Sequence, residues 1–149
     1  MTRKITQEEL NEILEKHKKW LNNEPGGEYA DFSGSDLSGR KLGCRDLRNS
    51  NLSDCDLRDS DLSGCDLRGS DLRNSNLCGC NLDFACLPLW CGSLLAHFDD
   101  RHIAQIIYHA VKAGLASPNL SDEVKAELRK MAPLANRFHR AKECGVIEE

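Results

Sequence analysis

The sequence predicts a β solenoid with α-helical segments on both sides of it. A leucine, or once a phenylalanine, recurs at every fifth residue from Phe32 to Leu87 without an insertion. Five residues of an α-helix turn the chain through about 500°, so these side chains would spiral around a helix and share no face. In a β-strand, every second one of them would point to solvent. A chain that turns once per five residues can bury all of them, and stacked coils of a solenoid then share the core.

Every five-residue unit repeats the same pattern around its centre. The centres are Phe32, Leu37, Leu42, Leu47, Leu52, Leu57, Leu62, Leu67, Leu72, Leu77, Leu82 and Leu87. The residue two positions before the centre is small in ten of the twelve units, and Arg40 and Arg45 are the exceptions. The residue directly before the centre is Asp or Asn in ten units, with Lys41 and Cys86 as the exceptions. If four units make one square turn, the leucine and the small residue both point inward on every side.

This small–Asp/Asn–Leu–x–x pattern resembles the A-[DN]-L-x-x motif of the pentapeptide-repeat family. The resemblance covers Ala30 to Leu89, about two fifths of the chain. It implies a right-handed quadrilateral β-helix, in which the twelve units form three coils. At a strand spacing of about 4.8 Å, three coils stack to about 15 Å, and both ends of so short a rod need caps. We therefore predict three parts: an N-terminal capping helix and linker (1–28), the β-helix (29–89) and a C-terminal helical segment (90–149).

The N-terminal part has the features of a capping helix. Thr6-Gln7-Glu8-Glu9 fits a capping box, in which a Thr side chain and a Glu three residues later bond to each other's backbone N–H groups. The apolar stripe that follows consists of Leu10, Ile13, Leu14, His17, Trp20 and Leu21. The residues 22–27, NNEPGG, end the helix. We expect the helix over residues 7–21 to cover the first coil.

The C-terminal part has helical periodicity. A first helix, capped by Asp99 or Asp100, is expected to be ended by Gly114 and Pro118. Ser121 can cap a second helix, and Pro133 can begin a third. The first helix carries the apolar residues Ile103, Ile106, Ile107, Ala110, Val111 and Leu115, and the second bears Val124, Leu128 and Met131. In the third helix we expect Leu134, Ala135 and Phe138 to face inward. This helical segment is longer than a minimal plug for the end of the solenoid requires.

Composition argues against several classes of protein. The net charge is −4, which does not suggest a general nucleic-acid binder or a membrane-surface protein. No apolar run approaches the ~18 residues of a membrane span, and the first residues, MTRKITQEEL, lack the apolar region of a signal peptide. We therefore expect a cytoplasmic protein of a bacterial host, in which the eight cysteines are reduced thiols.

The sequence lacks the patterns of the common catalytic sites. It has no Ser-His-Asp order, no Gly-rich phosphate loop and no H-E-x-x-H motif, so we predict no enzyme activity and no cofactor. Cys55, Cys65 and Cys80 occupy the small inward position and are expected to behave as apolar core residues. One alternative stays open: a small-molecule or zinc site where the solenoid meets the tail. Its candidate residues are Cys86, Trp90, Cys91, His97, His139 and Cys144.

The arginines of the solenoid are the candidate interaction residues. Arg48 and Arg68 are twenty residues apart, so they share one side of a square coil, whereas Arg58 and Arg73 fall on two other sides. Each can be neutralised by a neighbouring Asp or can contact a partner. Arg40 and Arg45 replace small inward residues in the first coil. They can either reach the end of the rod and meet acids of the capping helix or form a basic notch for a partner's carboxylate or phosphate.

These observations favour a non-catalytic interaction protein. The layout resembles small pentapeptide-repeat proteins of phages and prophages, which implies a factor that binds and inhibits a host enzyme, such as DNA gyrase or a CRISPR nuclease. Some family members resemble DNA in size and charge. The match here is partial, because residues 29–89 carry ten Asp against seven Arg or Lys, and the arginines interrupt the acidic columns. We expect a host protein as partner, with no direct binding to nucleic acid or membranes.

Overall fold

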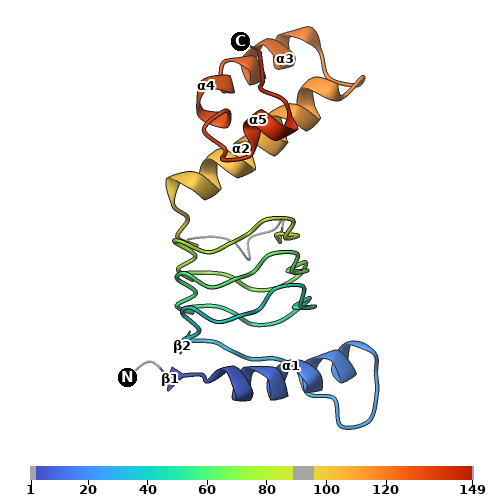
Figure 1. Cartoon of the computed structure of the whole chain (residues 1–149). Helices are drawn as coiled ribbons and strands as arrows, with labels where there is room; N and C mark the ends of the chain where they lie inside the picture. The colour runs from blue at the N-terminus through green and yellow to red at the C-terminus, as the bar shows by residue number, and fades with distance from the viewer. Residues whose placement is uncertain (1–2, 89–95, 149) are drawn as a thin grey trace. The chain divides into compact units, whose positions relative to one another are not determined.

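The computed structural model describes residues 3–88 and 96–148 (Figure 1). The chain divides into two compact units, 1–97 and 98–149, which we describe separately. The N-terminal helix and the C-terminal helices that the sequence predicts are both present. The predicted boundary between residues 89 and 90 falls on 89–95, outside the described residues, so the three-part division stays a prediction.

Four columns of parallel backbone bridges run up the solenoid of the first unit. Each column joins residues that precede a leucine and are twenty positions apart. The columns are Asp31–Asn51–Asp71, Asp36–Asp56–Asn76, Lys41–Asp61–Asn81 and Asp46–Asp66–Cys86. Figure 1 shows the resulting stack of coils. The predicted square coil of twenty residues is therefore present, and two bridges join the three residues of each column. Most of these bridges are single-residue contacts, because a turn interrupts the extended backbone in every unit.

The turns form because the residue two positions after each centre has a positive φ. This holds at eleven successive corners, from Gly34 to Phe84. At each described turn the next residue donates its N–H to the carbonyl of the centre, as Ser50 does to Leu47 O at 3.1 Å. Most residues with a side chain disfavour a positive φ, but Gly adopts it freely and Asn and Asp tolerate it. Nine of the eleven corners carry one of these three residues, and Cys44 and Phe84 are the others.

The core of the solenoid is a stack of leucines closed by small residues. Eleven of the twelve centres are buried, and Leu87, on the last side of the third coil, is partly buried. The small inward side chains are buried with their polar atoms satisfied. The hydroxyls of Ser50, Ser60, Ser70 and Ser75 each donate to the carbonyl of the preceding centre at 2.6–2.8 Å. Because these buried hydroxyls have partners, serine fits the inward position as well as alanine does.

An N-terminal strand and helix cover the first coil. Strand β1 (Arg3–Lys4) pairs in parallel with β2 (Ser35–Asp36), and the buried Ile5 follows it. Helix α1 spans Gln7–Leu21, as predicted, and the Thr6 hydroxyl accepts the Glu9 N–H. Leu10, Leu14 and His17 are its buried residues. Trp20, which the apolar stripe placed inward, is 39% exposed, because the stripe is wider than the surface that the first coil offers.

The second unit is a small helical cluster. Its helices are α2 (Asp100–Ala116), α3 (Asp122–Arg129), α4 (Ala132–Ala135) and α5 (Ala141–Cys144). Asp99 caps α2 by accepting the N–H groups of Arg101 and His102, and Ser121 caps α3. The buried core consists of Tyr108, Val111, Ala132, Ala135, Phe138, Ala141 and Ile147. No helix of the described residues is long and apolar enough to cross a membrane.

The apolar residues of α2 are buried only in part. Val111 is buried and Ile107 and Leu115 pack against the core, but Ile103 and Ile106 are each 39% exposed, and Tyr108 is buried on the same helix. The Tyr108 hydroxyl donates to Gly145 O at 2.7 Å, a contact with the C-terminal segment that periodicity cannot reveal. Val124 and Met131 are also exposed, at 44% and 41%.

Helix α2 ends at Ala116, between Gly114 and Pro118, the two residues that are predicted to end it. A Cβ atom at Gly114 would collide with Leu128 Cδ1 and would lie 3.5 Å from Leu120 Cδ1. Glycine therefore allows α3 and the preceding loop to approach α2 closely.

Candidate interaction surfaces

Four repeats carry an arginine two residues after the aspartate, and the two side chains are bonded to each other. In each pair, the Asp Oδ1 atom accepts the backbone N–H of the arginine, which is the local bond of an Asx turn. The guanidinium then folds back over the same carboxylate. Arg68, for example, donates from Nε to Asp66 Oδ1 at 2.8 Å and from Nη2 to Oδ2 at 2.5 Å. The pairs are Asp46–Arg48, Asp56–Arg58, Asp66–Arg68 and Asp71–Arg73.

The arginine is the outer member of most of these pairs. The side chain of Arg68 is 67% exposed and that of Asp66 is 23% exposed. The Asp56–Arg58 and Asp71–Arg73 pairs show the same order. Hydrogen bonds from the arginine side chain are the main cause that lowers the pKa of Asp66 below its usual value. These carboxylates therefore stay ionised but are covered, and a partner would meet guanidinium groups first.

One side of the solenoid carries two of these pairs on adjacent coils. Asp46 and Asp66 are bridged in the backbone, so the arginines that follow them lie one above the other. Arg48 Nε also lies 3.7 Å from Asp66 Oδ2, which links the two coils. We call Asp46, Arg48, Asp66 and Arg68 the arginine ladder.

The other aspartates of the acidic columns are also engaged in their own turns. The carboxylate of Asp61 accepts the Ser63 N–H at 3.0 Å. The carboxylate of Asp36 accepts both the N–H and the hydroxyl of Ser38, at 2.9 and 2.6 Å. These hydrogen bonds from serine lower the pKa of both carboxyl groups. Their first role is thus to hold the backbone turns in place.

Arg40 and Arg45 both reach the N-terminal cap. Arg40 Nε donates to the backbone carbonyl of Ile5 at 2.7 Å. Arg45 Nη2 donates to Asn11 Oδ1 at 3.3 Å, and its Nη1 atom lies 3.9 Å from Glu15 Oε1. The guanidinium groups leave the inward position at the end of the solenoid and attach the first coil to the segment that covers it. Whether they also bind a partner stays a prediction.

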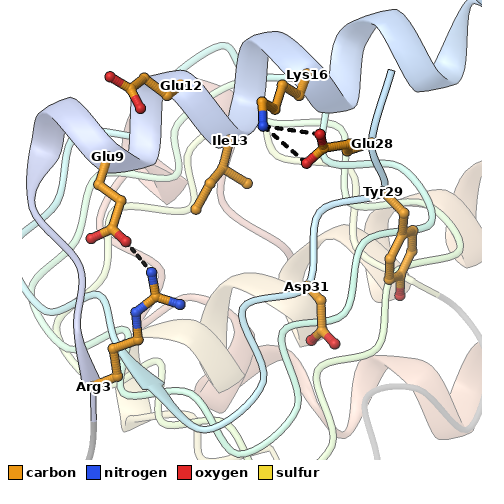
Figure 2. Close-up of a pocket in the computed structure, with 8 residues that line it drawn as sticks. All are labelled: Arg3, Glu9, Glu12, Ile13, Lys16, Glu28, Tyr29 and Asp31. Carbon is orange, nitrogen blue, oxygen red and sulfur yellow. Dashed lines mark hydrogen bonds and ion pairs between the residues drawn. The ribbon is translucent and has the colours of Figure 1, made fainter. Parts of the chain in front are cut away.

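A pocket of about 340 Å³ lies between α1 and the segment that follows it (Figure 2). Its lining residues are Arg3, Glu9, Glu12, Ile13, Lys16, Glu28, Tyr29 and Asp31. Arg3 pairs with Glu9, and Lys16 Nζ lies 3.0 Å from both carboxylate oxygens of Glu28. Figure 2 shows Ile13 between these two ion pairs. The lining carries no Ser, Cys or His side chain for nucleophilic chemistry.

Comparison with known proteins agrees with this geometry. The model of the family "Pentapeptide repeats (8 copies)" matches residues 30–69 and 55–88. Together the two matches cover residues 30–88, and this stretch is similar to pentapeptide repeats. The fold of that family is the right-handed quadrilateral β-helix, and its members are generally non-catalytic. No curated protein matches the chain.

Several solved structures of pentapeptide-repeat proteins are similar to the chain. One, from the cyanobacterium Cyanothece 51142, is 29% identical over 47% of this chain and 57% of its own, with a TM-score of 0.29. A second, from Nostoc sp. strain PCC 7120 and involved in heterocyst differentiation regulation, is 27% identical over 46% of this chain and 34% of its own, with a TM-score of 0.24. A third, also from Nostoc PCC 7120, is 19% identical over 66% and 99%, with a TM-score of 0.35. The chain thus spans less than two thirds of the first two proteins.

The alternative site beside the pentapeptide repeats stays a prediction. Trp90 and Cys91 lie outside the described residues, as does the side chain of Cys144. His97 and His139 belong to different units. Within the parts of the chain that the structure describes, no group of three or more His, Cys, Asp or Glu could hold a metal ion.

The cysteines of the repeats are expected to fall into two classes of reactivity. The thiols of Cys55, Cys65 and Cys80 are buried and donate to backbone carbonyls at 2.8–2.9 Å. Burial raises the pKa of Cys55 and of Cys65 to about 11, so little thiolate forms at neutral pH. Cys44 is exposed and Cys78 is half-buried. Cys86 is exposed as well.

We therefore predict that under native conditions a thiol reagent labels Cys44, Cys78 and Cys86 before the three buried thiols. Labelling of the three buried thiols should require unfolding. Peptide mass spectrometry at increasing labelling times measures this order, and a urea-unfolded sample provides the control in which all react together. Equal rates in the native protein would contradict the closed core.

Proposed function

We propose that this chain is a non-catalytic interaction module that binds and inhibits an enzyme of a bacterial host, as a factor of phage or prophage type. The observation that carries the proposal is the arginine ladder, in which two guanidinium groups stand above each other on one side of a rigid solenoid. The general absence of catalysis in the family supports the non-catalytic part.

The ladder has the properties of a binding surface for an acidic partner. Arginine is over-represented among residues that anchor interfaces, since its planar group makes several directed hydrogen bonds. Here each guanidinium is already held by its aspartate, so less side-chain freedom is lost on binding. We propose that a carboxylate-rich surface of the target enzyme meets this side, a nucleic-acid enzyme being one candidate.

The acidic columns support a DNA-like surface less well. Phosphate-like recognition needs carboxylates that are accessible, but those of Asp56 and Asp71 lie below their arginines. The carboxylate of Asp61 is bonded to the turn that follows it. We therefore rank the arginine ladder above the acidic columns as the surface that binds.

The test is a pair of charge-matched double variants. A pull-down from a bacterial lysate, read by mass spectrometry, first names a partner, and titration calorimetry then measures its affinity. We expect Arg48→Gln with Arg68→Gln to weaken binding by about tenfold at low salt and less at high salt. The control, Arg58→Gln with Arg73→Gln, removes the same charge from two other sides and should bind normally.

Stability is expected to stay nearly constant in both variants, because exposed ion pairs contribute little to folding. If the ladder variant binds normally, while Asp56→Asn, Asp61→Asn and Asp71→Asn together abolish binding, the acidic columns are the interface. The alternative function, a small-molecule or zinc-binding site near His97, is tested separately by metal analysis of the purified protein.

A further inference from the structure

His17 is a buried histidine that connects the capping helix to the solenoid. Its side chain is fully buried on the face of α1 that also carries Leu10 and Leu14. Both ring nitrogens bond to the backbone of the repeats. Nδ1 accepts the N–H of Ala30 at 3.2 Å, and Nε2 lies 3.0 Å from the carbonyl oxygen of Arg48. One side chain therefore joins α1 to two segments of the first coil that are far apart in sequence.

These two bonds assign the protonation state of the ring. A backbone N–H can only donate, so Nδ1 must carry a free lone pair. A backbone carbonyl can only accept, so Nε2 must carry the proton. The ring is thus the neutral Nε2–H form. A second proton on Nδ1 would face the Ala30 N–H, and this donor would then lack a partner in a buried place, since Ala30 is fully buried.

The surroundings of the ring also favour the neutral form. The charged groups that face it from the solenoid are Asp46, which favours the imidazolium, and Arg48, which opposes it. Trp20 stacks on the ring with a centroid distance of 5.6 Å, and the ionisable Tyr29 contacts its edge at 6.3 Å. Burial is the largest influence and lowers the pKa of His17 below 6.5.

We propose that His17 makes the cap a pH-sensitive lid, which opens at its C-terminal half when the ring is protonated. The N-terminal half has separate attachments: β1 pairs with β2, and the Gln7 side chain exchanges two hydrogen bonds with the backbone of Lys41, at 3.1 and 2.9 Å. These bonds do not titrate. Opening would therefore begin at His17 and uncover the end of the first coil, which is the face of the leucine stack that α1 covers.

The pH range in which the cap loses stability follows from the direction in which folding shifts the pKa of His17. An unfolded histidine binds a proton with a pKa near 6.5, whereas folded His17 binds one at lower pH. The stabilisation from the neutral ring is thus fully present above about pH 6.5 and is lost as the pH falls toward the folded pKa. The lowered pKa values of the aspartates act only near pH 3.8 and below, so a change between pH 7.5 and 5 reports on histidine.

The test is amide hydrogen exchange of the whole chain at pH 7.5 and 5.0, expressed as protection factors. We expect protection of the Ala30 amide and of residues 17–21 to fall at pH 5.0, by about tenfold for each unit by which the folded pKa lies below 6.5. The amides of α3, a helix without histidine, should not follow. NMR of the ring nitrogens should show that the neutral Nε2–H form predominates at about pH 6.5, where a free histidine is half protonated.

Two variants separate titration from packing. His17→Gln keeps one acceptor and one donor but cannot be protonated, so its lid should be equally protected at both pH values. His109→Gln removes an exposed histidine and should retain the wild-type response. If half or more of the wild-type His17 ring is charged at pH 6.5, or if protection at Ala30 is the same at both pH values, the proposal is wrong, whatever the stability of the glutamine variant.

Discussion

Replacing Leu62 by arginine is expected to abolish folding of the solenoid. Leu62 is fully buried in the middle coil, with Leu42 and Leu82 at the same position in the coils on either side. An arginine there would place an unpaired charge in a dry core, and such a change costs several kcal/mol. The whole stability of a domain of this size is about 5–15 kcal/mol. We expect an aggregated or unfolded protein, detected by size-exclusion chromatography and by loss of a cooperative thermal transition.

The neighbouring residue offers a matched control. Ser63 occupies the position at which four other repeats carry arginine, two residues after Asp61 as in an Asp–x–Arg pair. Ser63→Arg introduces the same side chain one residue away and should form a fifth pair, with a melting temperature within about 2 °C of the wild type. If Leu62→Arg gave a soluble protein that melts cooperatively with unchanged circular dichroism, Leu62 would not lie in a closed core.

Gly27→Ala is expected to detach the capping helix. A Cβ atom at Gly27 would lie 2.6 Å from Trp20 Cα and 2.7 Å from the carbonyl carbon of Lys19, which are backbone atoms that cannot turn aside. The segment after α1 is held against it by the bond from Glu28 N–H to Lys16 O at 3.1 Å. Overpacking of this kind costs about 3 kcal/mol. Urea unfolding measures the loss, and the fluorescence of Trp20 should change at low urea.

The adjacent glycine distinguishes collision from backbone strain. Gly26 has a φ of 75°, but nothing lies within 4 Å of its added Cβ. Gly26→Ala should therefore lower the free energy of unfolding by only about 1 kcal/mol, because an alanine in the left-handed backbone conformation is strained by about that amount. Equal losses in the two variants would show that the backbone of α1 does not approach Gly27 closely.

Much of the first unit can be predicted from local pattern alone. The period of five identifies the centres, and the small residues before them identify the other inward position, because both repeat at fixed spacing along the chain. The same residues also contained a signal that pattern reading left unused: Gly, Asn or Asp two positions after most centres marks the corners with positive φ. The bounds of α1 followed from its cap and its stop, which are local as well.

The candidate surface could be predicted only in part. Spacing by twenty residues placed Arg48 and Arg68 on one side, and the backbone bridges agree. Which member of each pair is outermost depends on how the guanidinium folds over a carboxylate that the turn already holds. A count of charges suggests an acidic surface, because the repeats carry more Asp than Arg or Lys. In three of the four pairs, however, the Asp side chain is less exposed than the Arg side chain.

The sequence by itself determined the solenoid, its corners and the presence of helices on both sides, because those features depend on residues at most a few positions apart. The tertiary structure alone decided which face of α2 is buried, why Gly27 and Gly114 are glycines, and where His17 finds its two partners. Each of these depends on an atom from a distant segment that arrives within a few ångströms. Periodicity specifies that a side chain turns inward, but a donor, an acceptor or a steric limit exists only where the folded chain brings two segments together.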